Sequence, residues 1–303
     1  MKITALTTLL AVACTWTLSA AELGMDAPEL QIKDWVKGKA IDLKAEKGKQ
    51  ITVVEFWATW CQPCRASIPH LSELQAKYKD KGVTVVGVSD ETVPKVKPFV
   101  EKMADQMNYV VAVDDARKTT AAYMEGFGVT GIPHAFIVDK QGRIAWHGHP
   151  MAGLDEALED IVNGRHDIES AKRSFNAEKS MRDYFELVAD GVATPKSKEL
   201  GESILKDASG NAELMNQFAW ILLTHPRLKN PDHELAGKAA KAAYDASKGK
   251  NASIVDTYAR AQFIRGKVQE AVDLQKKAID LCTEADLKPQ LEKTLKEYEA
   301  KLN

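Results

Sequence analysis

The strongest constraint on the fold of this 303-residue chain is a change of pattern near residue 167. Before it, short runs of β-branched residues alternate with stretches of helical periodicity. After it, the strand-like runs disappear and helical periodicity continues to the C-terminus. Strands that alternate with helices predict a sheet with a parallel core and helices packed on it. At ~100–200 residues per domain the chain has room for two domains, so we expect an α/β domain followed by an all-α domain.

Five apolar runs supply the expected strands of the first domain. They are 51–56 (ITVVEF), 83–89 (VTVVGVS), 109–113 (YVVAV), 135–138 (AFIV) and 143–147 (RIAWH). The last two runs are joined by the short segment 139–142, whose Asp and Gly are typical of a hairpin turn. Between strands, Ile68, Leu71, Leu74 and Tyr78 recur at helical spacing and predict one buried helix face. We therefore expect a mixed sheet, parallel at its centre, with the hairpin at an edge.

The second half of the chain carries a weak repeat. Ala236 and Ala243 are followed 35 residues later by Ala271 and Ala278. Small residues at such positions allow the two helices of a pair to pack closely. The pattern resembles the tetratricopeptide repeat, although the turn at 225–232 in the first copy is longer and lacks the glycine. We expect tetratricopeptide-like helical pairs, with a plain helical bundle as the alternative.

The N-terminus has the composition of a secretory signal peptide. Lys2 precedes an uncharged apolar run, 3–18, and small residues at 19–21 offer a cleavage site. The run is shorter than the ~20 apolar residues that a membrane-spanning helix needs. A lipid-modified Cys14 is the specific alternative. We therefore expect the mature chain to be exported, either to the periplasm or out of the cell.

These patterns divide the chain into four parts. They are a signal peptide (1–21), an α/β domain (22–166), a helical linker (167–200) and a helical-repeat domain (201–303). The net charge of −2 lacks the basic excess that nucleic-acid binding requires, so we expect no nucleic-acid partner.

Three cysteines remain in the expected mature chain, and two of them, Cys61 and Cys64, form a C-x-x-C pair. Such a pair serves as a redox centre, as half of a zinc site or as a structural disulfide. Zinc needs two further ligands, and only His70 follows nearby. A disulfide across so small a loop contributes little stability in the loop-entropy model. Cys282 stands alone in a helical segment and is interpreted as a small buried residue, with a second redox partner as the alternative.

The surroundings of the pair meet the requirements of a redox centre. Cys61 follows an apolar strand and begins a helix, where unpaired N–H groups and the helix dipole stabilise a thiolate. Cys64 lies one turn into the helix, in position to attack a mixed disulfide. Gln62-Pro63 suits the first helical turn, and Pro69 implies a kink.

A carboxyl and a second proline complete the candidate site. Glu55 lies within an otherwise apolar strand, and a buried carboxyl has a raised pKa that allows proton exchange near neutrality. An edge-strand acid that faces water is the alternative for Glu55. Pro133 stands just before the strand at 135–138, which indicates a special turn or a cis peptide bond.

Together these features resemble the thioredoxin superfamily, and within it the exported TlpA/ResA-like thiol-disulfide oxidoreductases. The motifs that carry the resemblance are 57–69 (WATWCQPCRASIP), Glu55 and 131–133 (GIP), and the insertion around 91–107 fits the subgroup. The match covers roughly residues 24–165. It implies an α/β thioredoxin fold, in which a central mixed sheet is flanked by helices. We expect no cofactor and no metal.

The resemblance also implies a role for each residue of the site. Cys61 would be the attacking cysteine and Cys64 the resolving one. Glu55 would be the buried acid, and Pro133 the cis-proline beside the disulfide. An extended substrate segment would add to the backbone next to that proline. The residues implied in substrate contact are Trp60, Gly131 and Ile132. The Gln62-Pro63 dipeptide departs from the Gly-Pro of thioredoxin, and that dipeptide helps to set the reduction potential.

We therefore expect a protein thiol-disulfide oxidoreductase that reduces disulfides of exported proteins with electrons from an upstream donor. The helical repeats would dock a partner protein. One alternative is a helical-repeat adaptor, metallochaperone or haem-maturation partner built on a thioredoxin-like scaffold. A thiol peroxidase is the other, although Thr59 is the only peroxidase-like residue shortly before Cys61 and no proline accompanies it.

Three histidines, His134, His147 and His149, fall near one end of the expected sheet. Imidazoles that converge there could bind a metal or tune the thiolate. A solvated strand end and turn is the simpler interpretation, because spacing alone indicates no convergence.

Overall fold

The computed structural model describes residues 21–189, 191 and 194–302, so Cys14 and all but the last residue of the expected signal peptide lie outside the described residues. The chain divides into two compact units, and the boundary in the sequence lies between His166 and Asp167. Each unit is described by itself. Within the described part of the chain, no helix combines the length and the apolar character needed to cross a membrane.

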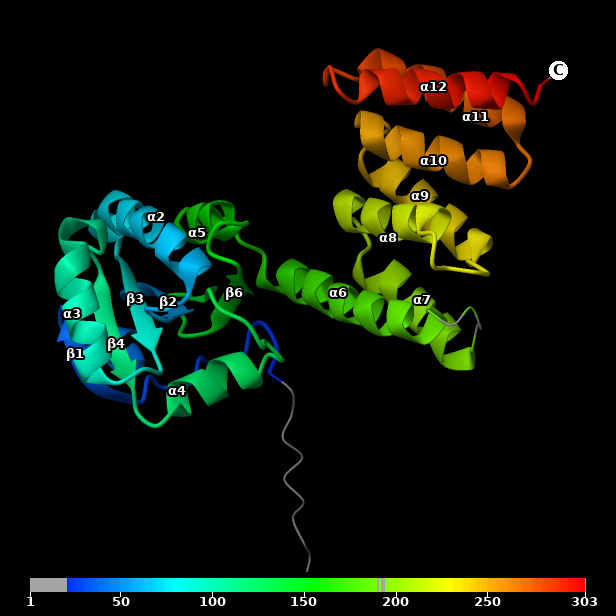
Figure 1. Ribbon diagram of the computed structural model, residues 1–303. Helices are drawn as coiled ribbons and strands as arrows, with labels where there is room; N and C mark the ends of the chain where they lie inside the picture. The colour runs from blue at the N-terminus through cyan, green and yellow to red at the C-terminus, as the bar shows by residue number, and fades with distance from the viewer. Residues whose placement is uncertain (1–20, 190, 192–193, 303) are drawn as a thin grey trace, which may run out of the picture. The chain divides into compact units, whose positions relative to one another are not determined.

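A six-stranded mixed sheet forms the centre of the first unit (Figure 1). Its strand order is β1-β4-β3-β2-β5-β6. The strands are β1 (Ile32–Lys37), β2 (Ile51–Trp57), β3 (Val83–Ser89), β4 (Val110–Asp114), β5 (His134–Val138) and β6 (Ile144–Gly148). Strands β2, β3 and β4 are parallel, whereas β5 is antiparallel to β2 and to β6. The expected hairpin is confirmed, and β2 lies in the interior of the sheet.

The strand β1 is one that the sequence patterns did not predict. It pairs antiparallel with β4 and forms the edge opposite the hairpin. Its sequence, IKDWVK, contains three apolar residues, and its side chains are only half-buried or exposed. An edge strand needs only one paired neighbour, so a strong apolar run is not required there.

Three helices cover one face of the sheet: α2 (Gln62–Tyr78), α3 (Val93–Met103) and α5 (Leu154–Val162). The expected helix face is confirmed, because Ile68, Leu71, Leu74 and Tyr78 are all buried. They pack against Val53 and the other residues of β2 that point to the same side. This layer contains both cysteines of the C-x-x-C pair.

The opposite face is covered by the short helix α4 (Lys118–Thr120) and the π-helical turn η3 (Ala121–Glu125). Here Tyr123 lies 5.2 Å from Phe136 and 5.7 Å from Phe56, measured between ring centroids. The remaining short elements are α1 (Leu43–Glu46), η1 (Lys79–Lys81) and η2 (Ala104–Gln106). Helices on both faces of a mixed sheet make this unit the thioredoxin-like fold that was expected.

In the described residues of the second unit, all of the regular secondary structure is helical (Figure 1). Its helices are α6 (Ile168–Val188), α7 (Pro195–Asp207), α8 (Ala212–Thr224), α9 (His233–Ala246), α10 (Ala252–Ile264), α11 (Val268–Leu281) and α12 (Lys288–Glu299). Consecutive helices pack as the pairs α6–α7, α8–α9 and α10–α11, and α12 packs on α11. The four alanines of the 35-residue repeat are fully buried.

The segment 167–200, which the sequence patterns separate as a helical linker, contributes to the core of this second unit. Tyr184 of α6 is buried 5.4 Å from the ring of Phe218 in α8. Ala177 and Met181 lie in the same apolar cluster. The long turn at 225–232 connects α8 to α9, as the departure from the repeat pattern indicated.

Candidate active site

The C-x-x-C pair lies at the start of α2, where β2 has just ended. Cys61 is the N-cap residue of α2, and its Sγ accepts a hydrogen bond from the Cys64 backbone N–H at 3.2 Å. The two cysteines are joined by a disulfide. Cys61 retains 4% exposure and Cys64 none, so only Cys61 can meet an incoming sulfur. The attacking role of Cys61 and the resolving role of Cys64 stay predictions.

The rest of the motif shapes the first turns of α2. Pro63 stands in the first turn, where the missing N–H removes no helical hydrogen bond. Pro69 lies inside the helix, and its ring removes the N–H that would bond to the carbonyl of Arg65. The helix nevertheless continues from Gln62 to Tyr78. One continuous helix therefore holds the cysteine pair.

The loop before β5 lies directly against the disulfide. The Ile132–Pro133 peptide bond is cis, and the Ile132 carbonyl oxygen lies 3.8 Å from Cys61 Sγ. Pro133 is buried, whereas Gly131 is exposed and Ile132 is half-buried. Trp60 is 72% exposed. The structure thus brings the three expected substrate-contact residues around one accessible cysteine.

Glu55 lies on the central strand β2 and has no exposed surface. It pairs with Gly87 of β3 on one side and with Ala135 of β5 on the other, so the edge-strand alternative is wrong. Neither carboxylate oxygen has a hydrogen-bond partner among the described residues. Burial raises the pKa of Glu55 to about 8. The side chain shares the face of β2 that α2 covers, together with Val53 and Trp57.

Two aromatic side chains that sequence reasoning missed lie near Glu55. The indole Nε1 of Trp57 and the hydroxyl of Tyr109 are buried without a hydrogen-bond partner among the described residues. Burial first, and the charge of Glu55 second, raise the pKa of Tyr109. Gly87 makes their approach possible, because a Cβ there would lie 3.0 Å from Trp57 Nε1 and 3.1 Å from the Tyr109 ring.

A second acid supports the loop that precedes the cysteines. Glu91 accepts hydrogen bonds from the Thr59 backbone N–H at 2.6 Å and from the Thr59 hydroxyl at 3.0 Å. The carboxyl ends of the parallel strands β2 and β3 lie next to each other, and Thr59 and Glu91 each follow one of them. Residues that follow neighbouring parallel strands lie close together, and this rule could have predicted the contact between Thr59 and Glu91 from the sequence.

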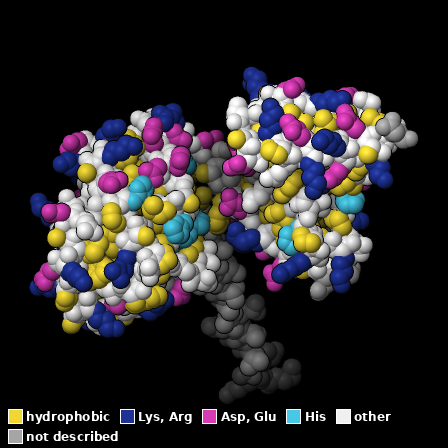
Figure 2. Space-filling model, turned by 45° about the horizontal axis from the view of Figure 1, so that its top comes forward, with side chains coloured by type: hydrophobic (Ala, Val, Ile, Leu, Met, Phe, Trp, Pro, Cys, Tyr) yellow, Lys and Arg dark blue, Asp and Glu magenta, His cyan; other side chains and the backbone are white. Residues whose placement is uncertain are grey.

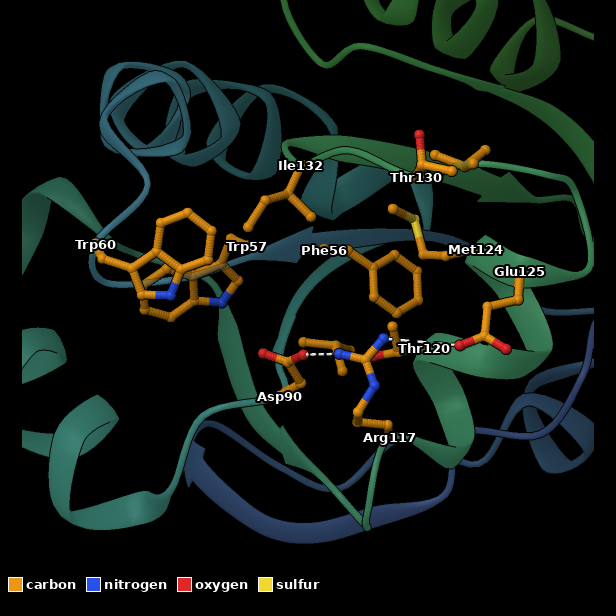
Figure 3. Close-up of a pocket in the computed structure, with 12 residues that line it drawn as sticks. Phe56, Trp57, Trp60, Asp90, Arg117, Thr120, Met124, Glu125, Thr130 and Ile132 are labelled. Atoms are coloured by element: carbon orange, nitrogen blue, oxygen red, sulfur yellow. Dashed lines mark hydrogen bonds and ion pairs between the residues drawn. The ribbon is translucent and has the colours of Figure 1, made fainter.

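A pocket of about 390 Å³ opens beside the cysteine loop (Figure 3). Its lining residues come from the ends of β2 and β3, from α4 and η3, and from the loop before Pro133. They are Phe56, Trp57, Trp60, Val88, Asp90, Arg117, Thr120, Met124, Glu125, Val129, Thr130 and Ile132. The guanidinium of Arg117 contacts Asp90 and lies 3.7 Å from Glu125 Oε1. No motif in the sequence indicated this pocket.

The three histidines converge in part. His134 Nε2 and His147 Nδ1 are 2.9 Å apart, whereas His149 Nδ1 accepts a hydrogen bond from the Met151 backbone N–H. Burial first, and then His147 and His149, lower the pKa of His134 to about 4. Histidine side chains also gather on the surface of the first unit in Figure 2. His134 and His147 therefore form a hydrogen-bonded imidazole pair, on the face of β5 opposite to Ala135. The simpler interpretation, a solvated strand end and turn, does not describe these two residues.

The other candidates lie away from this site. His70 Nε2 lies at hydrogen-bond distance, 2.9 Å, from Asp155 Oδ2, and this contact joins α2 to α5. Cys282 ends α11 in the second unit, half-buried, with Sγ 3.4 Å from the Glu284 carbonyl. Across the residues described, no group of three or more His, Cys, Asp or Glu side chains is arranged to hold a metal ion.

Comparison with known proteins relates the first unit to redox proteins. Residues 23–147 match the model of the AhpC/TSA family. The thiol-disulfide oxidoreductase ResA of Bacillus thuringiensis (strain Al Hakam) is 38% identical over 124 residues, which are 41% of this chain and 67% of that protein. ResA of Bacillus subtilis (strain 168) is 31% identical over 122 residues, 40% of this chain and 64% of that protein. Each of these two matches therefore spans about two-fifths of this chain.

Solved structures give weaker similarity. A putative thiol:disulfide interchange protein DsbE from Chlorobium tepidum is 26% identical with a TM-score of 0.39, covering 48% of this chain and 99% of its own. The thioredoxin domain of a thiol-disulfide oxidoreductase from Bacteroides vulgatus is 28% identical with a TM-score of 0.41, covering 47% and 99%.

Proposed function

Because the chain belongs to the thioredoxin-like thiol-disulfide oxidoreductases related to ResA, we propose that it reduces disulfide bonds of exported proteins. The observation that carries the proposal is the placement of Cys61, whose sulfur is the accessible one of a buried pair beside a cis-proline loop. The N-terminus of α2 stabilises the thiolate form of that sulfur. The proposed reaction is dithiol exchange through a mixed disulfide.

In the reduced protein, the Cys61 thiolate attacks one sulfur of the substrate disulfide. The substrate S–S bond breaks, and its second sulfur leaves as a thiolate. Cys64 then attacks the Cys61 sulfur, the mixed disulfide breaks, and the first substrate sulfur leaves. The Cys61–Cys64 disulfide forms, and two electrons have passed from the protein to the substrate. An upstream dithiol donor returns the pair to its reduced state.

Glu55 is the proposed proton acceptor for the second step. Cys64 is fully buried and must lose its thiol proton before it can attack. A carboxyl whose pKa lies near 8 is present in both protonation states around neutral pH, so it can take up that proton and later release it. Water is a less available proton acceptor for Cys64, because the side chains on this face of β2 are buried.

Substrate recognition is proposed at the loop that ends in Pro133. An extended substrate segment would add its main chain next to Gly131 and Ile132, which are exposed and half-buried. The exposed Trp60 would cover the segment from the other side. In this proposed arrangement a substrate sulfur would lie beside Cys61.

Export and partner docking complete the proposal. The uncharged apolar leader supports export, with residues 1–21 removed. The helical unit, with its fully buried repeat alanines, is proposed to be tetratricopeptide-like and to dock the partner protein. Amino-terminal sequencing of the mature protein from the exported fraction tests the first point, and an intact N-terminus would contradict it.

The decisive experiment is a trap in the full chain. Cys64→Ser should accumulate mixed disulfides through Cys61, visible on non-reducing gels and identifiable by mass spectrometry. The matched control is Cys61→Ser/Cys64→Ser, which should form none. Wild-type protein should also accelerate insulin reduction by dithiothreitol, whereas hydrogen peroxide consumption should stay at the background rate. Absence of adducts together with absence of insulin reduction would overturn the proposed function.

A further inference from the structure

A pocket lies beside the loop that carries Cys61, at the place where the proposed substrate segment would pass. Trp60 and Ile132, which flank the accessible cysteine, are also lining residues of the pocket (Figure 3). A segment that passes along the loop before Pro133 therefore runs past the mouth of a cavity of about 390 Å³. In an extended segment, successive side chains point to opposite sides. A residue near the target cysteine of such a segment would therefore direct its side chain toward the pocket.

The inner wall of the pocket is apolar. Phe56 and Val88 are almost fully buried strand residues, and Met124 of η3 lies beside them. Val129 completes this wall. A wall of this kind favours the methylene stem of a long side chain or a purely apolar side chain.

The rim of the pocket is charged and carries a net negative balance. Asp90 and Glu125 supply two carboxylates, and the guanidinium of Arg117 lies between them in Figure 3. One positive group against two negative groups leaves one negative charge uncompensated. Lys118, the next cation along the chain, is paired with Asp115 instead. The rim therefore favours an incoming cation and disfavours an incoming carboxylate.

The backbone that carries Arg117 is held in an uncommon conformation. Ala116 and Arg117 have φ values of 50° and 64°, in the left-handed region that residues with a Cβ seldom adopt. Residues in such conformations cluster at binding and active sites, where the surrounding structure maintains them. Here the two residues hold a charged side chain over a pocket next to the reacting sulfur.

The same wall is tied to the cysteine loop. Asp90 is followed by Glu91, which bonds to the backbone and hydroxyl of Thr59. The pocket rim and the loop that presents Cys61 are therefore parts of one hydrogen-bonded arrangement. A side chain bound in the pocket would fix the position of the neighbouring substrate cysteine relative to Cys61.

We propose that this pocket binds a lysine or arginine side chain next to the target cysteine of the substrate polypeptide. The apolar wall holds the stem, and Asp90 and Glu125 hold the charged head while Arg117 limits how strongly they do so. The proposal rests on the proposed function, because it names the substrate feature that the same site selects. A purely apolar side chain would contact the apolar wall but would make no ion pair at the rim. An acidic side chain would be repelled by the excess carboxylate.

The test measures reduction of short disulfide-containing peptides by the full-length reduced protein. Three peptides differ at one residue beside the cysteine: lysine, norleucine, which keeps the stem without the charge, and glutamate. We expect kcat/KM for the lysine peptide to exceed that for norleucine by about tenfold, and glutamate to be slowest. The ratio should fall as salt is added, because partly exposed charges are screened.

Variants separate the pocket from the general reaction. Glu125→Gln should bring the lysine-to-norleucine ratio toward one. Arg117→Gln should raise the ratio, because it leaves both carboxylates without their cation, and a merely structural role would not produce such a gain. Glu101→Gln, an exposed acid of α3 outside the pocket, is the matched control and should leave the ratio unchanged.

Two results would overturn the proposal in different ways. Equal rates for the lysine and norleucine peptides, or a ratio unaffected by Glu125→Gln, would contradict the proposed binding of a basic side chain in the pocket. The proposed reductase function would stand. If none of the peptides is reduced and insulin is not reduced either, both the proposed function and the proposed role of the pocket are contradicted.

Discussion

Glu91 holds Thr59 through two hydrogen bonds, one to the backbone N–H at 2.6 Å and one to the hydroxyl at 3.0 Å. This contact joins the segment after β3 to the segment after β2, two residues before Cys61. The acceptor is a carboxylate, so these bonds are stronger than bonds between neutral groups. The position of the attacking cysteine therefore depends on a side chain 30 residues away.

Replacing Glu91 by alanine should weaken both the fold and the reaction. We expect Glu91→Ala to lower the free energy of unfolding by about 1–3 kcal/mol, because the Thr59 N–H loses its acceptor. Insulin reduction should slow as well. Glu91→Gln, which keeps one acceptor oxygen, should lose less on both measures. Urea denaturation and turbidity assays check this, and equal behaviour of the two variants would contradict it.

The buried Glu55 predicts a distinct pH dependence of stability. The folded-state pKa of about 8 lies above the unfolded value of 4.5, so the folded state holds more protons between these pH values. Stability should therefore fall as pH rises from about 5 to 8 and level off above that. Each pH unit in this window corresponds to about 1.4 kcal/mol for one such group.

Glu55→Gln removes that group. For the oxidised proteins, the variant should gain stability over wild type by up to about 1.4 kcal/mol per pH unit between pH 5 and 8. Urea denaturation at a series of pH values measures the difference. Glu101→Gln, an exposed acid, serves as the control, and curves for Glu55→Gln and wild type that stay parallel would refute the assignment.

Short-range patterns explain why much of this site was predictable. Three features of the site depend only on residues close together in the sequence. They are the β-branched run around Glu55, the cysteine spacing at the start of a helix and the proline before β5. Glu55 stands out because a central strand buries it and its chain neighbours are apolar. Such a residue is visible without knowledge of its contacts.

Long-range contacts explain what was not predictable. The half-buried edge strand β1 depends on pairing with β4, which comes more than 70 residues later. Arg117 lines the pocket and has a left-handed backbone, and nothing in its sequence neighbourhood indicates that conformation. The partnership of His134 with His147 likewise arises from the register of β5 against β6.

Gly87 predicts a steric effect at the centre of the sheet. An added Cβ would lie 3.0 Å from Trp57 Nε1 and 3.1 Å from the Tyr109 ring, and both side chains are buried. We expect Gly87→Ala to cost about 1–3 kcal/mol of unfolding free energy, because buried rings cannot move without disturbing their neighbours. Gly131→Ala has open space around its Cβ and should change stability little. Comparable losses in both variants would contradict this reasoning.

The repeat alanines predict how tightly the helical unit is packed. Ala243 is fully buried in α9, whereas Ala246 on the same helix is exposed. Ala243→Leu should cost about 1–3 kcal/mol through overpacking, and Ala246→Leu should be nearly neutral. Urea denaturation followed by helical circular dichroism distinguishes the two, and a neutral Ala243→Leu would show that the helices leave room between them.

The imidazole pair predicts loss of stability in acid. The pKa of His134 is about 4 when folded and 6.5 when unfolded, so the unfolded chain binds more protons between these values. Stability should fall as pH drops from about 6.5 to 4 and change no further below that. We expect His134→Gln to remove about 2 kcal/mol of this acid-induced loss, since partial burial reduces the full effect. The control is His225→Gln, an exposed histidine in the second unit. Urea midpoints measured at pH 7 and pH 4.5 give the comparison, and an equal acid-induced loss in wild type and His134→Gln would exclude His134 as its source.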